Sequence, residues 1–360
     1  MYYNNCQSNE TRKEKIRMKI GIYNPYFDSM GGGERYTLSL ASHWSLSHDV
    51  HIFWDDPDIL AASEARFNIR LGRVKREANF FRLPIHQKLW KTRSYDCIFV
   101  LSDGSIPIHG ARKGILHFQV PFKRVSFPMW KRMKYQAIVC NSEYTARNLD
   151  SSLPIKRSVI YPPVDVTEFK EGKKSNTILS VGRFNGHYEA KKQGILIDAF
   201  RRGIEKKMFE GWSLVFAGSM LSSDKPFLEE LKKKAEGLPI TFFPNCTFEK
   251  MHDLYATSRI YWHAAGFGEH DPEHMEHLGI STVEAMSSGC IPVVFDGGGQ
   301  KEIVTDGSNG YLWSTVDELL EKTQKASQGN TDIVSNGIRR AEDFSERRFT
   351  EAFDGLLLSL

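Results

Sequence analysis

No apolar run in this chain of 360 residues approaches the roughly 20 residues that a membrane-spanning helix needs. Residues 1–17 are polar and charged, and they lack the apolar core of a secretory signal peptide. Both absences argue against a membrane-spanning or secreted chain. We therefore expect a cytoplasmic protein whose residues 1–17 form a flexible tail.

Cysteine is also scarce, with five residues spread over the chain and no Cys-x-x-Cys pair. This spacing provides neither a zinc motif nor a framework for disulfide bonds. We expect reduced thiols at Cys6, Cys97, Cys140, Cys246 and Cys290.

The composition is that of a folded protein. Hydrophobic residues make up 41% and charged residues 26%, which is ordinary for a soluble globular protein and excludes a disordered or collagen-like chain. The length suggests about two domains of roughly 150 residues each.

The basic residues are concentrated in the amino-terminal half. Residues 1–165 hold 25 lysines and arginines and 15 acids, whereas residues 166–360 hold 23 and 29. Residues 65–95 and 104–141 contain almost no acids, and the second stretch interleaves aromatic with basic residues. Such a surface attracts phosphate groups, so it is either a solvated face or a contact with an anionic membrane or a lipid-diphosphate acceptor. We do not expect a nucleic-acid partner, because no nucleic-acid-binding motif accompanies the charge.

Short apolar segments alternate with helical patterns in the first half of the chain. A glycine loop, Gly31-Gly32-Gly33-Glu34, leads into a helix predicted at residues 34–44. The predicted strands are residues 18–23, 49–54, 95–101, 114–118 and 137–140. This alternation is typical of a parallel sheet with helices on both faces.

The alternation restarts after Tyr161–Asn176, where prolines and a polar run break the pattern. Here the predicted strands are residues 177–181, 213–217, 240–243, 260–263 and 291–295, and the predicted helices are 193–204, 225–235 and 248–258. The sequence thus predicts an α/β protein with two Rossmann-like, doubly wound domains at 18–165 and 166–341. The last segment, 342–360, is expected to be an amphipathic helix, and the strand at 291–295 is expected to close the second sheet.

Two glutamates, Glu276 and Glu284, flank a glycine loop that opens a helix. The residues at this opening are Gly279, Ile280 and Ser281. Because a helix N-terminus offers N–H groups and a positive dipole end, it suits a diphosphate; Glu276 would then face the attached group, and Glu284 would accept hydrogen bonds from sugar hydroxyls. The alternative is structural, since Ser281-Thr-Val-Glu284 also fits a capping box that closes a helix end.

A basic pair accompanies the glutamates. Gly182-Arg183 follows a predicted strand directly, and Lys191-Lys192 precede the next predicted helix. A guanidinium and an ammonium at the carboxyl edge of a strand neutralise the charge that grows on a pyrophosphate leaving group. The plainer interpretation is two surface basic residues.

Six motifs in this order resemble the retaining glycosyltransferases of family 4, which have the GT-B fold, and the resemblance covers the chain from Met18 onward. The motifs are Gly31-Gly32-Gly33-Glu34, Leu116-His117-Phe-Gln-Val-Pro121, Asn141-Ser142-Glu-Tyr-Thr145, Tyr161-Pro-Pro-Val-Asp165, the pair Arg183 and Lys191, and Glu276-x7-Glu284. The resemblance implies two domains that face a cleft, an acceptor domain followed by a nucleotide-sugar domain, with the last helix crossing back to the first.

The resemblance also implies how the donor is activated. Arg183 and Lys191 would hold the diphosphate, helped by backbone N–H groups of Gly279, Ile280 and Ser281. Catalysis would depend on stabilising the departing diphosphate rather than on a protein nucleophile. No cofactor and no metal would be required besides the nucleotide sugar itself.

The sugar would be bound from both domains. By resemblance, Glu276 would bind donor sugar hydroxyls near the reacting carbon, and Glu284 the ribose hydroxyls. The backbone of Gly32 and Gly33 would approach the phosphate or sugar closely. His117 would contact the sugar or acceptor from the amino-terminal side.

Several stretches are similar to mannosyltransferases that elongate lipid-linked oligosaccharides from GDP-mannose. These are Gly31–Glu34, His117-Phe118, Tyr161-Pro162-Pro163, His263 and Glu276-His277-Leu278-Gly279-Ile280. We therefore expect a hexosyltransferase, with mannose favoured, that acts on a glycan or lipid-linked glycan. Two alternatives stay open: an enzyme that uses a UDP-sugar, and an inactive protein that binds a nucleotide sugar or scaffolds a complex.

Two further patterns could indicate a metal, although we expect none. The first is a group of histidines near acids, namely His263, His270, His274 and His277. The second is Asp56-Pro57-Asp58, which is more typical of a turn after a strand. Residues 266–275 are an insertion relative to the plainest family pattern, and they either shape the sugar pocket or form a surface loop.

Overall fold

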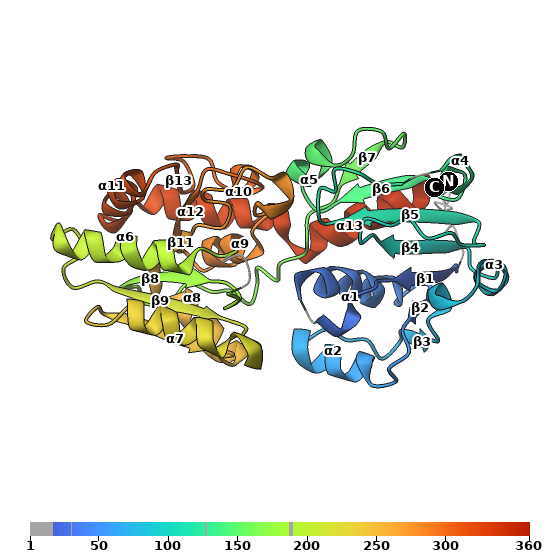
Figure 1. The fold of residues 1–360 in the computed structure, drawn as a ribbon, viewed down its shortest axis with the longest axis horizontal. Helices are drawn as coiled ribbons and strands as arrows, with labels where there is room; N and C mark the ends of the chain where they lie inside the picture. Colours follow the sequence, from blue (N-terminus) through green and yellow to red (C-terminus); the bar gives the residue numbers. More distant parts are fainter. Residues whose placement is uncertain (1–16, 30, 127, 187–189) are drawn as a thin grey trace, which may run out of the picture. The chain divides into compact units, whose positions relative to one another are not determined.

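The computed structural model describes residues 17–29, 31–126, 128–186 and 190–360, and it contains two β-sheets (Figure 1). The described residues divide into two compact units. One runs to Val100 and includes Pro107–Ile115, and the other comprises Leu101–Ile106 and Leu116–Leu360. The predicted tail at residues 1–17 lies outside the described residues, apart from Arg17.

The first unit is organised around β1, which pairs in parallel with β2 on one side and β4 on the other. Its strands are β1 (Lys19–Tyr23), β2 (Asp49–Phe53), β3 (Lys75–Glu77) and β4 (Cys97–Leu101). Its helices are α1 (Gly32–Trp44), α2 (Ile59–Phe67) and α3 (Ile85–Thr92). Ile20, Ile22 and every residue of β4 are buried, and β4 accordingly is a continuous apolar run.

The first sheet has seven strands in the order β3-β2-β1-β4-β5-β6-β7. Its later strands are β5 (Lys113–Phe118), β6 (Ala137–Cys140) and β7 (Arg157–Val159). Two short helices, α4 (Met129–Arg132) and α5 (Glu143–Asn148), belong to the same part of the chain. β6 and β7 are parallel, with Ile138 opposite Arg157.

The second sheet has six parallel strands in the order β10-β9-β8-β11-β12-β13. They are β8 (Ser175–Val181), β9 (Ser213–Gly218), β10 (Ile240–Pro244), β11 (Ser258–His263), β12 (Ile291–Phe295) and β13 (Tyr311–Trp313). The chain runs outward from β8 to β10 and then returns to the other side of β8. The strand order therefore reverses between β8 and β11, and ligands of open α/β sheets bind beyond the carboxyl ends of strands at such a point.

Helices cover both faces of the second sheet. They are α6 (Gln193–Glu205), α7 (Lys225–Lys234), α8 (Phe248–Thr257), α9 (Ile280–Ser287), α10 (Gln300–Ile303), α11 (Val316–Ser327) and α12 (Thr331–Ala341). Ile260 and Trp262 of β11 pack with α6, α7 and α11 on one face, whereas Tyr261 packs with α8 and α9 on the other. This alternation with a period of two buries both faces of the strand.

The predicted elements are confirmed almost everywhere. All ten predicted strands and the four predicted internal helices are present, and the predicted α/β class with two doubly wound sheets is confirmed. The prediction that residues 291–295 close the second sheet is wrong, because β13 pairs with β12 and forms the edge. The domain boundaries at 165 and 341 stay predictions.

The last segment is interrupted. A short 3-10 turn, Glu342–Phe344, precedes α13 (Glu346–Ser359), and Ser345 separates the two. Phe349, Phe353 and Leu357 of α13 are buried, in agreement with the predicted amphipathic pattern. That this helix crosses back to the amino-terminal domain stays a prediction.

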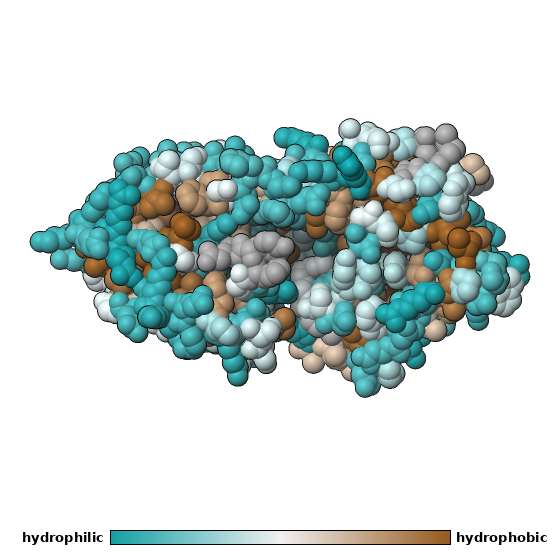
Figure 2. Space-filling view, viewed as in Figure 1, coloured by the Kyte–Doolittle hydropathy of each residue, from teal (hydrophilic) through white to brown (hydrophobic). Residues whose placement is uncertain are grey.

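Polar residues predominate on the face that Figure 2 shows. Figure 2 shows apolar atoms scattered among hydrophilic ones on the face in view. In the described part of the chain, no helix is both long and apolar enough to cross a membrane.

Candidate active site

Three segments of the chain lie at the point where the strand order of the second sheet reverses. Gly182-Arg183 follows β8, His263 ends β11, and residues 296–300 follow β12. Because β8, β11 and β12 are neighbours and parallel, these loops leave the same edge of the sheet. The loop that carries Glu276 comes to this edge as well.

Glu276 is the centre of this arrangement. Its Oε2 lies 2.5 Å from Nζ of Lys191 and 3.0 Å from Nε2 of His263. The carboxylate side chain is 17% exposed, and that of Lys191 is 33% exposed. Burial alone would raise the pKa of Glu276, but the charge of Lys191 and the hydrogen bond from His263 lower it below its ordinary value. Glu276 is therefore a carboxylate held in place by two donors.

A chain of hydrogen bonds orients His263. Its Nδ1 lies 3.4 Å from Nε2 of Gln300, and Oε1 of Gln300 accepts a hydrogen bond from Oγ1 of Thr282 at 3.0 Å. Because the carboxylate of Glu276 can only accept, Nε2 of His263 carries the proton and Nδ1 accepts from Gln300. Burial lowers the pKa of His263, which favours this neutral form.

Glycines allow the loop of Glu276 to lie directly against the loop after β12. A Cβ on Gly298 would lie 2.1 Å from the carbonyl oxygen of Glu276, and one on Gly299 would lie 2.3 Å from that of His277. The N–H of Gly299 donates to the carbonyl oxygen of Glu276 at 2.8 Å. The backbone of this triple-glycine loop thus sets the position of Glu276.

Helix α9 opens beside Glu276 as predicted, but the capping box does not form. Gly279 precedes the helix with φ 109°, in the left-handed region that favours glycine, and no side chain caps the helix. Ser281 is therefore already inside the helix, and its Oγ accepts a hydrogen bond from Tyr261 at 2.7 Å. Glu284 accepts one from the hydroxyl of Tyr255 at 2.8 Å. The structural alternative for Glu284 is wrong, and its carboxylate stays half-buried on the first turns of α9.

Arg183 and the two lysines lie on the loop between β8 and α6. The Arg183 side chain is exposed, and its carbonyl oxygen accepts a hydrogen bond from Nε2 of Gln193 at 3.1 Å. Lys191 reaches Glu276, and Lys192 reaches Glu269 at 2.7 Å. The lysines are therefore part of a charged network rather than isolated surface residues.

His117 lies at the carboxyl end of β5 and is fully buried. Its Nδ1 lies 3.1 Å from the carbonyl oxygen of Val139, and its Nε2 lies 3.1 Å from Nε2 of Gln119. Burial lowers the pKa of His117 to about 3, so the imidazole is neutral at physiological pH.

Gly32 and Gly33 open α1 in the other compact unit. Glu34, which is buried, accepts hydrogen bonds from the N–H of Gly31 at 2.8 Å and from the hydroxyl of Ser29 at 2.7 Å. This buried carboxylate fixes the start of the glycine loop. The structure thus brings together Glu276, Lys191 and the start of α9, whereas the roles of His117, Gly32 and Gly33 at the same site stay predictions.

The two patterns that could indicate a metal do not form a ligand set. Nowhere in residues 17–29, 31–126, 128–186 and 190–360 are three His, Cys, Asp or Glu side chains grouped closely enough to hold an ion. Asp56 instead accepts a hydrogen bond from the N–H of Asp58 at 3.0 Å, which is a turn before α2. The cysteines in the described part are free.

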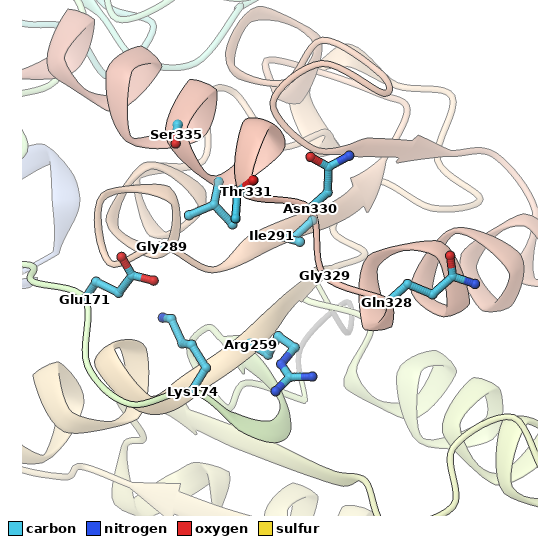
Figure 3. Close-up of a pocket in the computed structure, with 11 residues that line it drawn as sticks. Glu171, Lys174, Arg259, Gly289, Ile291, Gln328, Gly329, Asn330, Thr331 and Ser335 are labelled. Atoms are coloured by element: carbon cyan, nitrogen blue, oxygen red, sulfur yellow. The ribbon is translucent and has the colours of Figure 1, made fainter.

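A separate pocket of about 700 Å³ lies at the opposite, amino-terminal ends of β8, β11 and β12 (Figure 3). Lys174 and Arg259 line it, but the ammonium of Lys174 already donates to the carbonyl oxygens of Tyr255 and Ser288 at 3.3 Å and 2.5 Å. None of the predicted site residues lines this pocket, so we do not assign the donor to it.

Several residues of the site were not assigned to it from the sequence. His263 was considered only in a sub-family resemblance and a metal pattern, and Gln300, Tyr255 and Tyr261 not at all. One signal could have found Gln300: Asp296-Gly-Gly-Gly-Gln300 directly follows a predicted strand, as Gly182-Arg183 does. Glycines after parallel strands mark places where the backbone approaches a ligand or another loop closely.

Comparisons with known proteins agree with this geometry. The model for glycosyl transferases group 1 matches residues 165–342, and the model for Glycosyltransferase Family 4 matches residues 30–168. Among solved structures, Anabaena HepE in complex with UDP superimposes with a TM-score of 0.71 over 95% of this chain and 100% of that one, at 17% identity. A glycosyltransferase from Rickettsia africae gives 0.72 over 95% and 98%, at 15% identity.

Curated relatives are more similar in sequence but longer. The chain is 28% identical over 222 residues to GDP-Man:Man(3)GlcNAc(2)-PP-Dol alpha-1,2-mannosyltransferase of Caenorhabditis elegans, which is 56% of this chain and 44% of that protein. It is 28% identical over 296 residues to alpha-1,3/1,6-mannosyltransferase alg2 of Schizosaccharomyces pombe, or 69% and 55%. The matched region is therefore about half of the length of these relatives.

Together the two family models span residues 30–342. The chain therefore belongs to the glycosyltransferases of family 4, whose carboxyl-terminal part is matched by the model for glycosyl transferases group 1. Its two Rossmann-like sheets are those of the GT-B fold, as predicted.

Proposed function

We propose that this chain is a retaining hexosyltransferase that moves mannose from a nucleotide diphosphate sugar to a glycan or lipid-linked glycan. The observation that carries this proposal is the position of Glu276. Its carboxylate is held by Lys191 and His263 beside the start of α9, where the strand order reverses. A fixed carboxylate suits sugar hydroxyls, and a helix N-terminus suits the diphosphate next to them.

In this proposal the diphosphate is the centre of catalysis. Arg183 and Lys191, with backbone N–H groups around Gly279, Ile280 and Ser281, neutralise the charge that develops as the bond to the sugar breaks. An ammonium has three donors, so Lys191 can bind a phosphate oxygen without releasing Glu276. We propose that these groups supply the positive charge at the diphosphate and that the enzyme works without a cofactor or metal.

The sugar passes through an oxocarbenium-like state. Glu276 binds hydroxyls near the reacting carbon, Glu284 binds the ribose, and His117 with the backbone of Gly32 and Gly33 completes the site. The departing phosphate oxygen accepts the proton of the acceptor hydroxyl on the same face of the sugar. The new glycosidic bond therefore retains the configuration of the donor.

Mannose and GDP are proposed because the relatives above are named for GDP-Man, and the lipid-linked acceptor because they are named for PP-Dol substrates. A UDP-sugar is the alternative donor. The HepE structure contains UDP, but at 17% identity it supports only the fold. A direct donor test is needed to separate the two bases.

We also propose that the protein is cytoplasmic and touches an anionic membrane through its basic amino-terminal domain, where a lipid-linked acceptor would lie. Helix α3 supports this idea, because Ile85 and Trp90 are 58% and 57% exposed. Lys91 and Arg93 lie 5.4 Å and 5.6 Å from the Trp90 ring centroid. Exposed aromatic and aliphatic side chains flanked by cations are typical of contact with an anionic lipid surface.

The test is a donor panel on the purified protein. GDP-mannose, UDP-glucose, UDP-galactose and UDP-N-acetylglucosamine would each be scored for thermal stabilisation and for slow release of free nucleotide. We expect GDP-mannose to stabilise the protein and to be hydrolysed slowly, and Arg183→Ala to abolish both effects, whereas Arg66→Ala, an exposed residue on α2, leaves them unchanged. A response to UDP-sugars alone would replace GDP-mannose as the proposed donor. Stabilisation by a donor without release of nucleotide would favour the inactive binding protein, and silence across the panel would contradict the proposed donor.

A further inference from the structure

The insertion at residues 266–275 is not a free surface loop. It runs from the end of β11 to Glu276, and three of its acidic side chains contact other parts of the chain. Glu269 pairs with Lys192, Asp271 pairs with Lys123, and Glu273 accepts a hydrogen bond from the N–H of Lys123 at 3.2 Å. Short internal contacts hold its shape, since Asp271 also accepts a hydrogen bond from the N–H of Glu273 at 3.0 Å.

Lys192 has an unusual backbone conformation. It stands directly before α6 with φ 51° and ψ 35°, in the left-handed region, although it is not a glycine, and its side chain does not cap the helix. Non-glycine residues in this region are strained, and such strain persists only where the surroundings hold it. Asn68, Lys207 and Asn245 also have positive φ, so the conformation alone assigns Lys192 no role, and a role has to come from what its side chain contacts.

The ammonium of Lys192 donates a hydrogen bond to Oε1 of Glu269 at 2.7 Å. The two side chains are only 15% and 28% exposed, so this pair is more shielded than an ordinary surface ion pair. The hydrogen bond from Lys192 is also the main reason that the pKa of Glu269 lies below its ordinary value. The contact thus holds a charged, shielded pair in one geometry.

Lys191 and Lys192 are neighbours, and one segment of chain binds both. Glu269 holds Lys192, and seven residues later Glu276 holds Lys191 at 2.5 Å. The loop before α6 is therefore tied to the Glu276 loop at two points. If the ion pair of Lys192 and Glu269 were removed, the backbone of Lys192 could leave its left-handed conformation. The ammonium of Lys191 would then lose its fixed distance from Glu276.

We propose that Lys192 and Glu269 are positioning residues for the donor: their ion pair fixes the loop before α6 so that Lys191 and Glu276 face the diphosphate and the sugar together. This inference rests on the proposed function, because it assigns the pair to the same donor site. It also resolves the two interpretations of the insertion. The insertion shapes the sugar pocket, not by contacting the sugar, but by holding the residues that do.

The contact with Lys123 gives the insertion a second anchor. Lys123 lies in the loop after β5, which begins with Gln119, and His117 lies near the end of β5 itself. Nζ of Lys123 lies 2.7 Å from Oδ2 of Asp271, with side chains 52% and 38% exposed. Because this pair is exposed and screened by salt, we expect it to contribute less to fixing the position of the insertion than the pair of Lys192 and Glu269 does.

The test compares four variants with the wild type on the donor that the panel identifies. They are Glu269→Gln, Lys192→Gly, the charge-reversed double variant Lys192→Glu with Glu269→Lys, and the control Glu229→Gln. The control removes an exposed pair on α7, in which Glu229 lies 2.8 Å from Lys232. Steady-state kcat and KM, the affinity for the nucleoside diphosphate of that donor by calorimetry, and Tm are measured for each.

We expect Glu269→Gln and Lys192→Gly to lower kcat/KM for the donor at least tenfold, with Tm within a few degrees of the wild type. Lys192→Gly is the most informative variant, because glycine relieves the backbone strain and keeps or raises Tm while the activity falls. The charge-reversed variant should recover kcat/KM to within about threefold, since it restores the pair with opposite polarity. The control should match the wild type.

The inference and the proposed function fail in different ways. A wild type that is inactive on every donor overturns both. An active wild type with unchanged kcat/KM in Glu269→Gln and Lys192→Gly overturns the inference alone. So does a double variant that is no more active than the single ones. If Glu269→Gln is poorly folded, Lys192→Gly decides, because its loss of strain separates activity from stability.

Discussion

The ammonium of Lys191 lies 2.5 Å from the carboxylate of Glu276, 85 residues further along the chain. Each residue belongs to a different loop at the carboxyl edge of the second sheet. The two sequence motifs that were matched separately, a basic pair and a pair of glutamates, are therefore one charged unit. His263 contacts the same carboxylate oxygen and completes it.

Glu276→Gln tests this unit. The amide keeps the size of the side chain but loses the charge that holds Lys191, so we expect donor turnover to fall about 100-fold or more while the protein stays folded. Initial rates with saturating donor and a circular dichroism melt would measure both effects. Glu321→Gln, an exposed position on α11, is the matched control.

The pH dependence gives an independent check on Glu276. Its pKa in the folded protein is lowered, so the stability that it contributes is fully present above its unfolded pKa of 4.5 and is lost only as pH falls through the lower folded value. An acid limb in the activity profile above pH 4.5 should therefore persist in Glu276→Gln, on whatever activity remains. If the variant lost that limb, Glu276 would be titrating in this range and our assignment of a stable carboxylate would be wrong.

Gly298→Ala tests whether backbone packing positions Glu276. Gly298 has φ 59°, and a Cβ there would lie 2.1 Å from the carbonyl oxygen of Glu276. Gly307 has φ 72° with nothing within 4 Å of its Cβ position, so Gly307→Ala isolates the cost of the left-handed conformation, about 1 kcal/mol. We expect Gly298→Ala to cost at least about 2 kcal/mol in the free energy of unfolding and to reduce turnover, whereas Gly307→Ala leaves turnover unchanged. If urea denaturation showed the same loss in the free energy of unfolding for Gly298→Ala and Gly307→Ala, the contact with Glu276 would be unimportant.

Sequence reasoning found the parts of this protein that leave a local pattern. Buried strands such as β4 and β9 are nearly continuous apolar runs, so they were predicted with small errors at their ends. Two short edge strands, β3 and β7, were missed because they consist of Lys-Arg-Glu and Arg-Ser-Val and bury little. An edge strand is defined by hydrogen bonds to its neighbour rather than by its own composition.

The candidate site shows the same difference between local patterns and contacts that depend on the fold. Glu276, Glu284, Arg183 and Lys191 belong to spaced motifs and could be proposed from sequence. The link between His263 and Gln300 could not, because it depends on β11 and β12 being neighbours in the sheet. The capping-box alternative failed for a backbone reason, since the left-handed Gly279 starts the helix before Ser281.

Chelation tests the proposal that the enzyme works without a metal. Arg183, Lys191 and the start of α9 supply the positive charge that a divalent ion would otherwise supply to the diphosphate. We expect turnover of the identified donor to change less than twofold after dialysis against EDTA. A loss that magnesium or manganese restores would contradict this prediction.

His117 should make the folded protein less stable in mild acid. Burial lowers its pKa from 6.5 to about 3, so below pH 6.5 the unfolded chain binds a proton that the folded protein does not. The resulting loss of stability grows as pH falls from 6.5 towards 3 and amounts to about 2 kcal/mol at pH 5. His117→Asn removes this contribution, and its amide can still donate towards the carbonyl oxygen of Val139. Between pH 7 and pH 5, urea denaturation should therefore show the free energy of unfolding falling by about 2 kcal/mol less in His117→Asn than in the wild type, while His86→Asn, an exposed position on α3, follows the wild type. Parallel pH profiles for wild type and His117→Asn would mean that the buried imidazole accepts a proton in the folded state, and that its surroundings are more polar than the fully buried position of the side chain indicates.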